Sequence, residues 1–124
     1  MAVSTYLVHA ILDAIFNATA FGLAGNPYIS LHNGNPGTTG ANELSGGSYA
    51  RMQVAFNASA DRNVKNTSTF TFTLLPAAAI TYIGVWDAAS GGNFLIGGPL
   101  SDSYTVAAGG SFPLTAEHII GAIT

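Results

Sequence analysis

The sequence predicts a mainly β protein, an antiparallel, jelly-roll-like β-sandwich with one N-terminal amphipathic α-helix and a long glycine-rich loop. Three observations lead to this fold class. Apolar residues recur at helical spacing near the N-terminus, short alternating runs follow, and Gly-Gly pairs separate these runs. A chain of 124 residues fits one domain. We place the helix and a turn at 1–25 and the β-sandwich at 28–124.

The N-terminal segment has the pattern of an amphipathic helix. Ser4 is a suitable N-cap, and a broad apolar stripe follows at i+4 spacing. Its members are Leu7, Ile11 and Ile15, alongside Val8, Leu12 and Phe16. A polar row of His9, Asp13 and Asn17 repeats on the opposite face, which we interpret as solvated because no third metal ligand is near. We expect the helix to end by 22–25. The polar row also argues against a signal peptide or a membrane helix.

The remaining chain contains runs typical of strands. We expect strands at 28–32, 49–56, 69–74, 80–86 and 94–96, with 103–106 and 112–123 supplying the last two or three. Threonine alternates with apolar residues at 69–74, and the run at 80–86 is apolar on both faces, as in a central strand. Turns or breaks are expected at 57–66, at Pro76, at 87–93 and at 97–99.

Three segments share one order of residues: a small residue, Gly-Gly, a polar residue and an aromatic one. They are 45–49, 90–94 and 108–112. Paired glycines allow the positive φ of tight turns, and the aromatic residue would then pack at the start of a strand. The recurrence supports an antiparallel arrangement.

The low charge content limits the possible partners. Only 7% of the residues are charged, the net charge is −3, and the cations are Arg51, Arg62 and Lys65. Binding to a nucleic-acid backbone or to an anionic membrane needs several cations on one face, so neither partner is expected. With 48% hydrophobic residues, such a chain fits a subunit whose surface is covered by neighbours. The alternative is a secreted, Thr/Ser-rich β domain.

No motif for catalysis, a cofactor or a metal is present in the sequence. The three histidines are scattered, the acids occur singly, cysteine is absent, and the glycine-rich loop lacks the lysine of a phosphate-binding loop. We therefore expect no enzyme, no cofactor and no metal. Asp87 could bind calcium with Ser90 or Asn93, but capping of a glycine turn is favoured. Trp86 could stack on a sugar, but a core position is favoured.

The segment 32–51 reads as a long structured loop that holds five of the fifteen glycines. Its residues, His32-Asn-Gly-Asn-Pro-Gly-Thr-Thr-Gly-Ala-Asn-Glu-Leu-Ser-Gly-Gly-Ser-Tyr-Ala-Arg51, resemble the signature of a family of small tailed-bacteriophage virion proteins. Those proteins are often labelled tail fibre or minor tail proteins, and typically read Leu-His-x-Gly-x-Pro-Gly, then Gly-Ala-Asn-Glu, then Gly-Gly-Ser-Tyr-Ala-Arg. The run 83–93 resembles their second motif, in which Phe or Tyr usually stands in place of Trp86.

The resemblance implies a non-enzymatic structural subunit of a virion that is assembled in the host cytoplasm. Because the chain has no long shaft or repeat, we expect a capsid decoration or cement protein that forms a closed homotrimer and contacts other virion proteins, such as the major capsid or tail proteins. The interface is expected in the loop, at His32, Asn35, Pro36, Asn42, Glu43, Tyr49 and Arg51.

Two further expectations concern particular side chains. The charges of Glu43, Arg51 and Asp102 are expected to form ion pairs within or between subunits. The alternative function is a tail fibre or minor tail component that binds a receptor or carbohydrate, which would use exposed aromatic side chains. The candidates are Tyr28, Tyr49, Tyr104 and Trp86.

Overall fold

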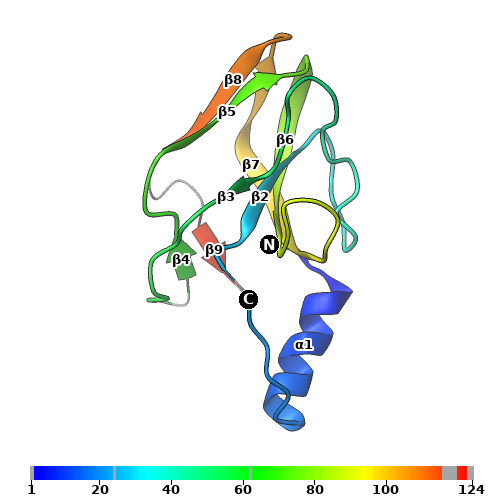
Figure 1. Ribbon diagram of the computed structural model, residues 1–124, viewed down its shortest axis with the longest axis vertical. Coiled ribbons are helices and arrows are strands. Elements are labelled where there is room, and N and C mark those ends of the chain that lie inside the picture. The colour runs from blue at the N-terminus through cyan, green and yellow to red at the C-terminus, as the bar shows by residue number, and fades with distance from the viewer. Residues whose placement is uncertain (1, 24, 62, 116–119, 123–124) are drawn as a thin grey trace.

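The computed structural model describes residues 2–23, 25–61, 63–115 and 120–122. In chain order they form β1 (Ala2–Val3), α1 (Thr5–Phe16), β2 (Tyr28–His32), β3 (Met52–Gln53), β4 (Asn63–Lys65), β5 (Phe70–Leu75), β6 (Ala78–Trp86), β7 (Phe94–Val106), β8 (Gly110–Leu114) and β9 (Ile120–Ala122). Figure 1 shows α1 extending away from a body built of strands.

Every strand pairing among the described residues is antiparallel. One sheet has the order β1-β7-β6-β2-β3, and two smaller sheets pair β5 with β8 and β4 with β9. The predicted mainly β, antiparallel fold is therefore confirmed, and β6 has the predicted central position between β7 and β2. Closure of these sheets into a jelly-roll-like sandwich stays a prediction.

The hydrophobic core joins the large sheet to the β5–β8 pair. Ile29 and Leu31 of β2 are fully buried, and they belong to one cluster with Phe72 and Leu75 of β5 and Leu114 of β8. The threonines of β5 are exposed on the other side. The alternation that predicted this strand is therefore correct from Phe70 to Thr73. It is wrong at Leu74, which is 59% exposed, because a φ of 52° and a register shift at this point bury Leu75 in its place.

The helix ends earlier than predicted, at Phe16 rather than at 22–25. Ser4 is the N-cap, as predicted, and accepts a hydrogen bond from the Leu7 amide. At the other end, Ala18 has a φ of 53°, and the Thr19 N–H donates to the carbonyl of Asp13. A left-handed residue turns the chain away from the helix axis, so the apolar residues beyond it cannot continue the helix.

The apolar stripe of α1 is mostly exposed. Leu7 is buried and Ile11 is half-buried, but the exposed fractions are 41% for Val8, 45% for Leu12, 67% for Ile15 and 76% for Phe16, four residues on one side of the helix. The stripe is thus divided into a narrow part that packs on the body, near β7, and a wider part that faces solvent.

The predicted strand at 49–56 forms a ladder only over Met52–Gln53. Val54 is buried as its alternation predicts, and its N–H donates to the carbonyl of Pro27. Pro27 has no N–H to return this bond, so the ladder cannot continue there. The segment 57–66, expected as a turn or edge, includes the short strand β4.

The predicted break at 97–99 is wrong, because β7 continues through it over 13 residues. Pro99 lies opposite Tyr82, whereas Tyr104 lies opposite Ile80, so the residues between 99 and 104 bulge out of the ladder. A proline at the edge of a bulge costs no ladder hydrogen bond. Of the expected strands in 112–123, β8 and β9 are seen, and residues 116–119 and 123 lie outside the described residues.

Candidate functional site

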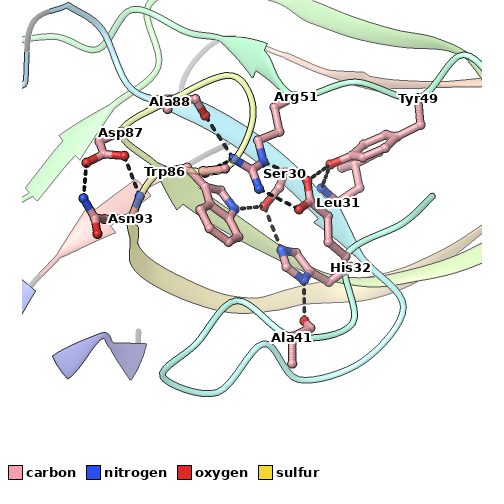
Figure 2. A network of polar contacts seen from close by, with 12 residues as sticks. Ser30, Leu31, His32, Ala41, Tyr49, Arg51, Trp86, Asp87, Ala88 and Asn93 are labelled. Atoms are coloured by element: carbon pink, nitrogen blue, oxygen red, sulfur yellow. Dashed lines mark hydrogen bonds and ion pairs between the residues drawn. The ribbon is translucent and has the colours of Figure 1, made fainter. Parts of the chain in front are cut away.

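The motif residues meet in one polar network between β2, the long loop and the turn after β6 (Figure 2). Arg51 is at its centre. Its Nε and Nη2 donate to the two carboxylate oxygens of Glu43, both at 2.9 Å, and its Nη1 donates to the carbonyls of Ala88 at 3.0 Å and Gly91 at 2.9 Å. The guanidinium carbon also lies 3.6 Å from the ring centroid of Trp86. One cation therefore ties the loop to the β6–β7 turn.

Tyr49 extends this contact to the backbone of β2. Its hydroxyl donates to Glu43 at 2.7 Å and accepts the Leu31 N–H at 3.1 Å. Burial alone would raise the pKa of Glu43, but the hydrogen bonds from Arg51 and Tyr49 outweigh it and hold that pKa below its usual value. Burial, and then the hydrogen bond to Glu43, raise the pKa of Tyr49. At neutral pH the site thus holds one carboxylate, one guanidinium and one neutral phenol.

His32 belongs to a row of four hydrogen-bonded groups beside the ion pair: the Ala41 carbonyl, the His32 ring, the Ser30 hydroxyl and the Trp86 indole. Its Nδ1 lies 2.7 Å from the Ala41 carbonyl, which can only accept, so Nδ1 carries the proton. Its Nε2 then accepts from the Ser30 hydroxyl at 2.7 Å, and the oxygen of that hydroxyl accepts the Trp86 indole N–H at 2.9 Å. Every donor in this row of hydrogen bonds has an acceptor when the imidazole is neutral.

Protonation of His32 would disturb this order. Burial lowers the pKa of His32, and the hydrogen bond to Ala41 offsets this only in part. A second N–H on the ring would point at Ser30, whose own hydroxyl hydrogen would then lose its acceptor. Ser30 and His32 are both 0% exposed, so no water could replace that acceptor. The neutral form is therefore favoured.

Two glycines leave room for the network. A Cβ at Gly84, which faces β2, would lie 2.6 Å from the Ser30 hydroxyl oxygen and 2.8 Å from Nε2 of His32. A Cβ at Gly40 would collide with the Trp86 ring, and Gly40 has a φ of 81° that favours glycine in any case. The two signature motifs are thus adjacent in space because these positions lack side chains.

The alternatives left open for Asp87 and Trp86 are decided by geometry. Asp87 accepts from the backbone N–H of Asn93 at 2.7 Å and from its side-chain amide at 2.9 Å, so it caps the turn as favoured. Trp86 is 8% exposed and packs edge-on against Phe94. The favoured core position of Trp86 is confirmed.

Five of the expected interface residues are occupied by contacts within the chain. His32 and Pro36 are buried, and Glu43, Tyr49 and Arg51 belong to the network. The expected ion pair of Glu43 and Arg51 lies within one chain.

Asn35 and Asn42 are the exposed members, and they brace the loop. The Asn35 carboxamide oxygen accepts from the Gly37 N–H, and the Asn42 amide donates to the Asn35 carbonyl. A contact of these residues with a neighbouring subunit stays a prediction. Ser30 was missed, since no local pattern marks it.

In the ranges that the structure describes, no group of three His, Asp or Glu side chains is placed to hold a metal ion. No helix there is long and apolar enough to cross a membrane.

The two signature motifs hold their own loop in place, and most of the apolar stripe of α1 stays exposed. The family described as podophage GP4 fiber I protein gp80 matches residues 2–121, so the chain belongs to that family. The expected relation to tailed-phage virion proteins is confirmed. A comparison with curated proteins finds no match.

The network predicts that Arg51→Ala lowers the free energy of unfolding by about 2–4 kcal/mol, because it leaves Glu43 and two turn carbonyls without their partner. Urea unfolding followed by tryptophan fluorescence measures this change. Asp102→Asn is the control, because this substitution removes one charge at an exposed position that lies outside the network. Equal unfolding midpoints for Arg51→Ala and wild type would contradict this account.

The pKa directions predict that stability falls on acidification. The pKa of His32 is lowered, so the unfolded chain takes up its proton first, and stability is lost as the pH falls below about 6.5. The lowered pKa of Glu43 adds a further loss below about 4.5. We expect urea unfolding to show the first loss between pH 7.5 and 5 in wild type, and a flatter profile in His32→Gln.

A second measurement checks this in the wild-type chain, whether or not the variant folds. An NMR titration of the His32 ring should show it neutral at pH 6.5. A midpoint at or above 6.5 would be the contrary result.

Proposed function

We propose that this protein is a non-enzymatic component of a phage tail fibre or minor tail structure, located in the virion. Membership of a fibre-type podophage family supports this role. The same membership favours a fibre over the capsid decoration protein expected from the sequence, for which the family description gives no support.

The exposed side of α1 is the observation that carries the proposal. Ile15 and Phe16 are 67% and 76% exposed on an element outside the core. Large apolar side chains that are contiguous and exposed mark surfaces that another protein covers. The chain as a whole carries few charges, which fits a protein that makes permanent contacts in an assembly. The partners proposed are other virion proteins and further copies of this chain, the latter in a closed homotrimer.

A receptor- or carbohydrate-binding role is the second candidate, and one groove favours it. The bulged part of β7 and the facing β8 form a half-open groove of about 220 Å³, lined by Leu100, Ser101, Asp102, Ser103, Tyr104, Phe112, Pro113 and Leu114. Tyr104 is 43% exposed, and its ring lies 4.9 Å from that of Phe112. An aromatic face beside a carboxylate and two hydroxyls has the chemistry that binds a sugar. Of the other expected aromatics, Trp86 is buried, Tyr28 is half-buried in β2, and Tyr49 is half-buried in the network.

The location is tested by separating heads and tails from one virion preparation and probing both with an antibody to this protein. We expect the antibody to detect the protein in the tail fraction. Purified protein added to tails that lack it should bind them saturably. Saturable binding to heads alone would overturn the fibre assignment and restore the decoration protein.

The groove predicts that Tyr104→Ala lowers glycan binding by up to about tenfold, as expected for the loss of one stacking contact in a small site. A glycan array with the whole chain identifies the ligand, and titration calorimetry measures the change. Tyr6→Ala is the matched control, because Tyr6 is also 43% exposed but lies on α1, away from the groove. No binding by wild type, or equal loss in both variants, would exclude this role.

A further inference from the structure

The surface of α1 has two apolar sides, and only one of them has a partner in the chain. Leu7 is buried and Ile11, Ala10 and Ala14 are half-buried, on the side that meets the body. The exposed stripe, defined as Val8, Leu12, Ile15 and Phe16, lies beside it. The polar row occupies the remaining side. A helix that is apolar on two sides is typically enclosed by two partners.

The spacing of the exposed stripe is that of a helix–helix seam. Val8, Leu12 and Ile15 follow at i, i+4 and i+7, the interval at which apolar residues repeat in coiled coils. The stripe contains no charge, and the helix carries only one, on Asp13 in the polar row. Such a surface offers no charged group to select a different partner, and it is complementary to itself.

We propose that the exposed stripe of α1 docks on the same stripe of a second copy of this chain. The proposal rests on the structural role above and names the partner for that surface. Figure 1 shows that α1 extends away from the strands, so two helices can meet without the two bodies occupying the same space.

The area of the stripe fits this occupant. Side chains in this size range present roughly 150–250 Å² each, so the four exposed fractions amount to roughly 350–570 Å² per copy. Full burial on two copies covers roughly 700–1,100 Å² in total, which is at the lower limit of about 1,000 Å² for a specific interface. An interface of this size associates in a concentration-dependent way, and the virion would add further contacts.

The absence of cysteine from the natural sequence makes cross-linking a clean test. Leu12 lies in the middle of the stripe, so Leu12→Cys brings two thiols together in either a parallel or an antiparallel pair. We expect Leu12→Cys to form a covalent dimer with a short bismaleimide. Asp13→Cys, in the polar row one residue away, should remain monomeric under the same conditions. Equal cross-linking of both variants would overturn the proposal.

Sedimentation equilibrium of the unmodified chain gives the second measurement. We expect wild type to have a mass of two chains, or of three in a closed ring. Phe16→Glu is expected to be a monomer, and because the Phe16 side chain is 76% exposed, this substitution should not disturb the fold. A wild-type chain that is monomeric at all concentrations overturns self-docking. The proposed function is judged separately, by whether the chain is found in tails, so each can fail without the other.

Discussion

The guanidinium of Arg51 is the contact on which the arrangement of the long loop depends. Four of its five N–H groups have acceptors in the chain, and its face lies on Trp86. These contacts connect three segments that have little else in common: residue 43 in the loop, the segment leading into β3, and the β6–β7 turn. The chain has only three cations, and one of them is committed to this pair. Because the pair itself is neutral, the net charge of −3 lies on the other charged residues.

The second half of the network is neutral, and it also fixes the arrangement of the long loop. The chain from Trp86 through Ser30 and His32 to Ala41 places polar groups in the core with every donor satisfied. Buried polar groups that are fully paired specify one arrangement of the surrounding residues, whereas an unpaired one would be costly. The loop therefore packs against β2 in one register, with residue 44 donating to the Leu31 carbonyl. A stretch rich in glycine thus behaves as part of the core.

Much of the fold follows from local patterns. The alternation from Phe70 to Thr73, the N-cap at Ser4 and the capped turn after Trp86 depend on residues close in sequence, and they were predicted correctly. The alternation was wrong at Leu74, where a register shift in the β5–β8 pair exposes the side chain. The continuity of β7 could not be predicted, because Pro99 is tolerated only by a bulge that the pairing with β6 creates. The early end of α1 depends on the left-handed backbone at Ala18, which its residue type does not favour. The Glu43–Arg51 pair was foreseen, but the link from Ser30 to Trp86 spans 56 residues and has no local signal.

The central claim is that the network makes the long loop a part of the folded core, and amide hydrogen exchange tests it most directly. The amide of Ala41, which donates to the Pro36 carbonyl, and that of Leu44, which donates to β2, report on the loop. The account predicts that both exchange as slowly as the amides of β2 and β6 in the same sample. Exchange of these two amides at the rate of exposed segments, with β2 still protected, would contradict it.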